Sequence, residues 1–170
     1  MPRESYQKLI SQLREDVLYM SELVSNHLRS GLDALEQKDE ELAMEIIERD
    51  EDVNTMYLEI EQQCIKLIAL QQPVASDLRI IAASFKIITD LERIGDLATN
   101  LAEYASVADR DVFPEVDIQH IGDEIDKMLT QAMQAYADED AERCRAVAAS
   151  NNNVDELCEA ASSHTAEYRR

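Results

Sequence analysis

The sequence predicts an all-α protein made of tandem three-helix bundles of long antiparallel helices, the second bundle lacking its last helix. Glycine and proline number only 3 each in 170 residues, too few for the turns of a many-stranded sandwich or barrel. Aromatic residues make up 5% and tryptophan is absent, a composition that disfavours sheets. Apolar residues instead recur at alternating three- and four-residue spacing, which is typical of helices packed in a bundle.

The first helix is predicted over residues 5–36, where an apolar stripe runs for about four heptads. His27 falls within this stripe, so we interpret it as a packed histidine of the seam; a pH sensor or a ligand is the alternative. The stripe consists of Tyr6, Ile10, Leu13, Val17, Met20, Val24, His27, Gly31 and Ala34.

Two further helices are predicted over 40–71 and 75–105. Asp39 can cap the first of them, and Pro73 separates the two because proline disfavours helix at the preceding residue and suits a first helical turn. Short links between long helices predict antiparallel neighbours, so residues 1–107 form the first three-helix repeat.

Residues 108–116 are predicted as a linker, and residues 117–170 as a second repeat with helices over 117–137 and 140–167. A shift of 101 residues places Val17 on Ile118 and aligns the two apolar stripes. Arg170 then matches Ala69, so the second repeat stops before its third helix. We expect its open seam to be covered by the first bundle, a second copy or a missing helix, and we favour a truncated chain.

The charge is strongly acidic, with 36 Asp and Glu against 16 Lys and Arg and a net charge of -20. This balance argues against nucleic acid as a direct partner and against a bare anionic membrane, since both need a basic face. Cations or basic protein surfaces suit it better. A surface adapted to high salt is the alternative explanation of the overall charge.

Cysteine usage and the absence of targeting signals predict a cytoplasmic location without membrane insertion. The cysteines are Cys64, Cys144 and Cys158, an odd number without a CxxC motif, which fits a reducing compartment. No signal peptide and no apolar run of about 18 residues occurs. Enzymatic activity is not expected, because the three histidines lie far apart and no glycine-rich phosphate loop is present.

Two acidic pairs suggest a metal site. Glu48 and Asp52 on the second helix, and Glu92 and Asp96 on the third, each show the spacing that places two carboxylates on one helical face. Neighbouring helices lie about 8–10 Å apart, so two such pairs can surround a hard cation with oxygen ligands. Asp50 falls in the apolar stripe and is expected at the edge of the site. A solvated acidic face remains the alternative.

The segments LQQPVASDLRIIAASFKIITD (70–90) and DLERIGDLATNLAEYA (90–105) resemble the third helix of the PhoU family of phosphate-uptake regulators, and ERDEDVN (48–54) resembles its second helix. The resemblance implies multinuclear metal clusters, of iron in some members. It assigns the metal to Glu48, Asp52, Glu92 and Asp96, with Asp50 and Asn100 as neighbours. The second repeat departs from this pattern, with Ala149, Asn151 and Asn153 at the matching positions, so a second cluster is not expected.

The resemblance also implies a function. PhoU-like proteins restrain phosphate uptake and phosphate-starvation signalling through contact with the ATPase of the phosphate ABC importer and with the phosphate sensor histidine kinase. We therefore expect a negative regulator, homodimeric and recruited to the inner face of the membrane by its partners. Two alternatives stay open: a metal-storage bundle with redox chemistry, and a structural adaptor that binds no metal.

Overall fold

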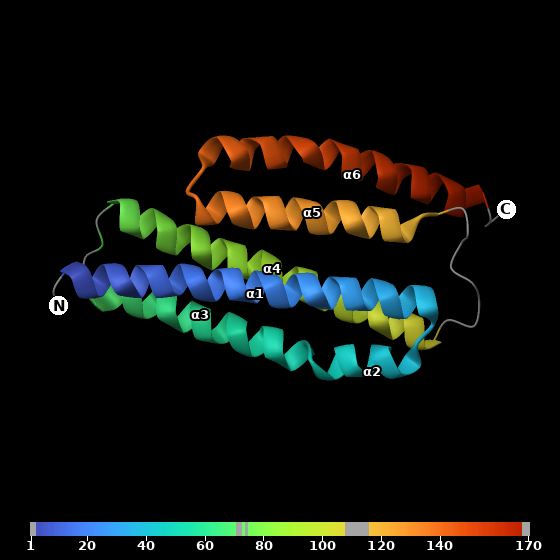
Figure 1. The fold of residues 1–170 in the computed structure, drawn as a ribbon, viewed down its shortest axis with the longest axis horizontal. Coiled ribbons are helices and arrows are strands. Elements are labelled where there is room, and N and C mark those ends of the chain that lie inside the picture. Colours follow the sequence, from blue (N-terminus) through green and yellow to red (C-terminus); the bar gives the residue numbers. More distant parts are fainter. Residues whose placement is uncertain (1–2, 71–72, 74, 108–115, 168–170) are drawn as a thin grey trace.

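The computed structural model describes residues 3–70, 73, 75–107 and 116–167, of which 164–167 by their backbone only. These stretches form six helices and contain no strand, which confirms the all-α prediction; none of the helices is long and apolar enough to cross a bilayer. Consecutive long helices run antiparallel (Figure 1). Of the predicted linker, only Val116 lies within the described residues. The helices are α1 (Arg3–Gln37), α2 (Glu40–Glu48), α3 (Asp50–Leu70), α4 (Ala75–Val107), α5 (Ile118–Ala137) and α6 (Ala141–Glu167).

The apolar stripe of α1 forms the centre of the core. Leu13, Val17, Met20 and Val24 are all 0% exposed. The burial of each side chain contributes about 1.5–3 kcal/mol to the stability of the fold. This stripe therefore holds α1 against α3 and α4. The buried partners on α3 and α4 are Val53, Ile60, Cys64, Leu67, Ile81, Ile88 and Leu91.

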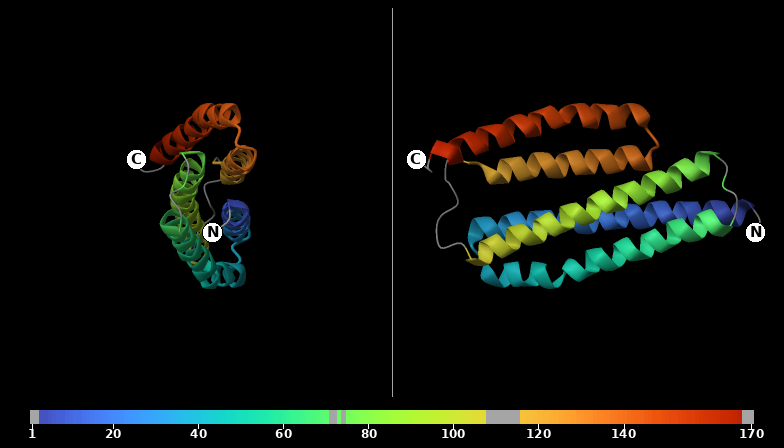
Figure 2. Two further views of the ribbon diagram at one scale, coloured as in Figure 1. Left: turned by 90° about the vertical axis from the view of Figure 1, so that its left-hand side faces the viewer. Right: turned by 180° about the vertical axis from the view of Figure 1, so that it is seen from behind.

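The backbones of α1 and α4 approach each other closely at Gly31. A Cβ atom at this position would lie 2.8 Å from the carbonyl oxygen of Ala98. Glycine is therefore required for the observed spacing of the two helices. Seen from behind, α4 crosses α1 at a shallow angle and covers it along much of its length (Figure 2).

Two polar side chains buried in this core lie within hydrogen-bond distance of backbone carbonyl groups. The Tyr6 hydroxyl donates to the carbonyl oxygen of Leu67 at 3.0 Å, and Nε2 of His27 lies 3.2 Å from the carbonyl oxygen of Ile46. His27 is thus a packed seam residue, as we interpreted it. Burial raises the pKa of the Cys64 thiol to about 11, so this cysteine remains a neutral core group.

The helix predicted over 40–71 is not continuous, and this prediction is wrong at Arg49, where the chain leaves α2 and enters α3. The residue after the break is a charged member of the apolar stripe. Asp50 occupies a position of the apolar stripe between Ile46 and Val53, and a carboxylate cannot be buried there without a partner. At the break Asp50 is only half-buried, and it accepts a hydrogen bond from Oγ1 of Thr99 at 2.7 Å.

The second repeat docks on the first through α1 and α5. Ser25 Oγ donates to Oδ1 of Asp126 at 2.5 Å, and Arg29 Nε donates to Oδ2 at 2.7 Å. Ser25 and Asp126 are 101 residues apart, the shift that relates the two repeats, so a residue contacts its own counterpart. This is the contact expected on a local two-fold axis between α1 and α5.

On one side of this axis, further contacts fill the interface between α1 and α5. The Gln119 side-chain amide donates to the carbonyl oxygen of Leu32 at 2.8 Å, and Gly122 leaves room for the Leu32 side chain, which would lie 2.2 Å from a Cβ there. The Ser84 hydroxyl of α4 lies 2.8 Å from the Tyr136 hydroxyl of α5. α5 is thereby held by two helices of the first repeat.

The turns that end α1 and α5 match at the same shift. Lys38 and Glu139 both have positive φ, 53° and 54°. Each is followed by an aspartate that caps the next helix: Asp39 accepts from two backbone N–H groups, and Asp140 accepts from the N–H of Arg143 at 3.0 Å. The predicted cap at Asp39 is confirmed.

The last helix, α6, lies on the outer side of α5 (Figure 2), and among the described residues its backbone comes close to that of α5 alone. Through Ser163, Val154 is its one buried side chain, at 9% exposed. Ile121 and Met128 of α5 are half-buried. The second repeat is therefore packed less completely than the first.

Candidate functional site

The carboxylates of interest lie where α3 passes α4. The helices are close at Gly95, where an added Cβ atom would lie 3.1 Å from Cγ1 of Val53, a tight contact. Gly95 stands between Glu92 and Asp96 in the sequence, so the close approach brings the start of α3 toward both carboxylates. Helical geometry places Glu92 and Asp96 on one face of α4.

Asp50 is fixed at this junction by two side chains. Besides the bond from Thr99, it accepts a hydrogen bond from the Asn54 amide at 3.3 Å. Thr99 also donates to the carbonyl oxygen of Gly95, at 3.2 Å, and is itself 8% exposed. The carboxylate that seemed misplaced in the stripe is thus held between α3 and α4.

Glu92 is the titratable group that this arrangement perturbs. Burial first, then the charge of Asp96 and a hydrogen bond with it, and then the charge of Asp50 raise the pKa of Glu92 above its usual range; Arg93 opposes the shift. Three carboxyl groups from two helices therefore interact here. Crowding of this kind favours either a shared proton or a cation.

The other predicted residues are not drawn into this group. Glu48 ends α2 and Asp52 belongs to α3, so the break at Arg49 separates the pair, and both side chains are exposed. Asn100 is exposed on α4. Among the residues that the structure describes, no three His, Cys, Asp or Glu side chains are arranged to hold a metal ion. The oxygen donors of Asp50, Glu92 and Asp96 fit a hard cation in chemistry, without converging on one point.

Two residues of this site were not anticipated from the sequence. Thr99 and Asn54 hold Asp50, and neither belongs to an acidic pair. A signal was present for each, since Asn54 lies four residues after Asp50 and Thr99 lies four residues after Gly95. In the second repeat the counterparts Ala149, Asn151 and Asn153 are exposed on α6.

Comparison with known proteins places the chain in a family. Residues 17–105 match the PhoU domain. A phosphate-specific transport system accessory protein PhoU homolog from Pseudomonas putida is 36% identical over 149 residues, which cover 86% of this chain and 58% of that protein. The homolog from Aquifex aeolicus is 34% identical over 152 residues, covering 88% of this chain and 69% of its own length. The chain thus spans little more than half of the first relative.

The fold agrees with these matches. The crystal structure of PhoU from Pseudomonas aeruginosa superimposes with a TM-score of 0.89 at 32% identity, over 96% of this chain and 79% of that one. The matched segment contains the junction of α3 and α4 with Asp50, Glu92 and Asp96. On sequence and on structure, this chain belongs to the PhoU family.

Proposed function

We propose that this protein is a cytoplasmic, non-enzymatic regulator of phosphate uptake and phosphate-starvation signalling. Membership in the PhoU family supports the proposal, as do the names of the relatives, which describe accessory proteins of a phosphate-specific transport system. The observation that carries it is that residues 90–105, which bear the resemblance, form the part of α4 where the charges of Asp96 and Asp50 act on Glu92.

The partners that we propose are the ATPase of the phosphate ABC importer and the phosphate sensor histidine kinase, whose activity the protein restrains. A net charge of -20 suits association with basic protein surfaces, because complementary charge accelerates association and selects the partner. These partners would bring the protein to the inner face of the membrane. Homodimer formation is a further prediction, which sedimentation equilibrium of the purified chain tests.

The proposed metal site consists of Glu48, Asp52, Glu92 and Asp96, with Asp50 and Asn100 beside it. The raised pKa of Glu92 supports it, because carboxyl groups crowded enough to interact in this way are relieved by a cation. A cation bound here would supply positive charge at the junction of α3 and α4. The resemblance to the PhoU family implies that this cation is iron in some members. Within the protein, Thr99 and Asn54 orient Asp50, while Glu92 and Asp96 present the carboxylates of α4.

Metal analysis of two charge-matched variants tests the site. Asp96→Asn should lower the metal content of the purified protein, whereas Asp90→Asn, an exposed change on the same helix, should leave it intact. Circular dichroism should show unchanged helicity in both, since neither side chain belongs to the core. Equal metal content in the two variants would contradict the site and favour a metal-free adaptor.

The regulatory role is tested in native cells. Deletion of the gene should raise phosphate uptake and starvation signalling when phosphate is plentiful, and the importer ATPase should co-purify with the tagged protein. Unchanged uptake would contradict the proposal. Turnover of oxygen or peroxide by the metal-loaded protein would instead support the storage and redox alternative.

A further inference from the structure

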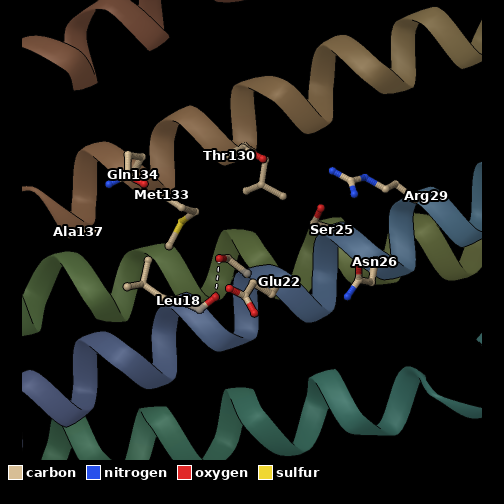
Figure 3. Close-up of a pocket in the computed structure, with 11 residues that line it drawn as sticks. Leu18, Glu22, Ser25, Asn26, Arg29, Thr130, Met133, Gln134 and Ala137 are labelled. Atoms are coloured by element: carbon tan, nitrogen blue, oxygen red, sulfur yellow. Dashed lines mark hydrogen bonds between the residues drawn. The ribbon is translucent and has the colours of Figure 1, made fainter.

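A groove of about 470 Å³ lies between α1 and α5, along the line where the two repeats meet (Figure 3). Its lining is provided by these two helices alone. It lies beside the Ser25–Asp126 contact of the local two-fold axis, in the half of the interface that Gln119 and Gly122 do not close. Pockets that hold small organic ligands have about 300–1,000 Å³, so this one suits a small ligand.

One wall of the groove is apolar. Leu18 of α1 and Leu129 of α5 are half-buried, and Met133 of α5 is 7% exposed. In Figure 3, the side chains of Met133 on α5 and Leu18 on α1 point toward each other. Met133 is already buried in the core, so a hydrocarbon chain placed here would remove from water the apolar surface that Leu18 and Leu129 still expose.

The polar groups of the groove favour a cation. Arg29 is the one basic residue of the lining, and both its Nε and its Nη2 donate to Asp126. The Ser25 hydroxyl is also engaged by Asp126. Glu22 is exposed, borders the groove and, within the described stretches, has neither a hydrogen bond nor an ion-pair partner in the protein.

These charges disfavour inorganic phosphate as a ligand of this groove, although the relatives are named for phosphate transport. An anion would meet an unpaired carboxylate and a guanidinium already bound to Asp126. A cation would meet Glu22 and the hydroxyl of Thr130, in the field of a chain with a net charge of -20. The ligand that fits has a short apolar chain and one positive head.

We propose that the groove binds a small aliphatic ammonium compound. Its hydrocarbon chain packs among Leu18, Leu129 and Met133, and its ammonium group pairs with Glu22 and donates to Thr130. This site is separate from the carboxylates of α3 and α4 and does not depend on the regulatory role proposed above.

The probe for the first experiment is n-pentylammonium, titrated into the full chain and followed by amide NMR. Saturable shifts are expected in α1 and α5 around the groove, with a Kd on the order of 1 mM for so small a ligand. n-Pentanol, which lacks the charge, and methylammonium, which lacks the chain, should each bind at least about tenfold more weakly if both halves of the site contribute. Inorganic phosphate should produce no shifts there.

Two charge-matched variants complete the test. Glu22→Gln should weaken binding of n-pentylammonium about tenfold, because it removes the partner of the ammonium group. Glu15→Gln makes the same charge change on the same helix away from the groove and should change the Kd less than about twofold, as expected for screened surface charge. Circular dichroism verifies that both variants fold. Equal weakening in the two variants, or shifts that do not saturate, would overturn the proposal.

Discussion

Val53 in α3 and Val154 in α6 occupy equivalent positions in the two repeats, yet Val53 is 1% exposed and Val154 is 9% exposed. The first helices of the repeats differ in the same direction, since Met20 of α1 is fully buried and its counterpart Ile121 of α5 is half-buried. In the first repeat, α4 lies against both α1 and α3. In the described part of the second repeat, no third helix lies against both α5 and α6. An apolar stripe therefore makes a helix amphipathic, and the number of neighbouring helices decides how much of it is buried.

The two repeats also differ in the continuity of their second helix. The first repeat breaks at Arg49, whereas α6 runs unbroken through the equivalent Ser150. Asp50 is bonded to Thr99 of α4, while its counterpart Asn151 is exposed and donates to Asp155 within its own helix, at 2.9 Å. The break thus accompanies a contact with a third helix, which the second repeat lacks among its described residues.

The largest expected difference concerns the paired valines. Val53→Ala should cost about 2–3 kcal/mol, because it leaves a cavity in a fully packed core. Val154→Ala should cost about 1 kcal/mol, because fewer atoms surround the lost methyl groups. Urea denaturation followed by circular dichroism measures both. Equal losses would show that the second repeat is packed as tightly in solution as the first.

Gly31 of α1, whose counterpart in the second repeat is Ala132, gives a test that depends on the sign of the change in stability. In an open helix Gly→Ala stabilises by up to about 1 kcal/mol. In α1 the added Cβ would press on the backbone of α4, so Gly31→Ala should destabilise by about 1–2 kcal/mol instead. Thermal unfolding of this variant measures the change. A gain in stability would mean that α1 and α4 are farther apart than the structure shows.

The contact between the repeats is probed at Asp126. Asp126→Asn removes the charge that Arg29 pairs with but keeps the shape of the side chain. Because the Arg29 side chain is 61% exposed and water can solvate it in the variant, the free energy of unfolding should fall by only about 1 kcal/mol. In hydrogen exchange, the substitution should accelerate exchange more in α5 and α6 than in α3. A uniform acceleration over all helices would show that the repeats unfold as one unit.

The smallest effect is the pH dependence of Glu92 in metal-free buffer. Its raised pKa means that the folded protein holds this proton more firmly than the unfolded chain. The associated stability is present below the usual titration range of glutamate, about pH 4.3, and is lost as pH rises through the raised value. At neutral pH, Glu92→Gln should therefore be more stable than the native chain by a few tenths of a kcal/mol.

The comparison for that experiment is a series of melting curves from pH 4 to 7 in the presence of a chelator. The difference between the native chain and Glu92→Gln should grow with pH over this range, because only the native residue acquires a repelled charge there. A difference that is constant with pH would mean that Asp96 and Asp50 do not act on Glu92 in solution.

Much of the fold follows from local features of the sequence. Helix formation depends on apolar spacing, and helix starts depend on caps a few residues away. Asp39 and Asp117 show this, since both accept backbone hydrogen bonds at the predicted helix starts. The spacing of Glu92 and Asp96 on one face of α4 is local in the same sense. The matching turns at Lys38 and Glu139 likewise reflect the 101-residue repeat.

Contacts between residues far apart in the chain decided the rest. Thr99 bonds Asp50 across 49 residues, and Arg29 bonds Asp126 across 97. The break at Arg49, the crowding at Glu92 and the groove beside Glu22 all lie where such contacts bring helices together. The amino-acid sequence by itself determined the helices, their caps and their apolar faces, because these depend on neighbours within about one or two turns. Only the tertiary structure decided where a helix bends, which carboxylates meet and where a groove stays open, because the packing of one helix against another sets these features.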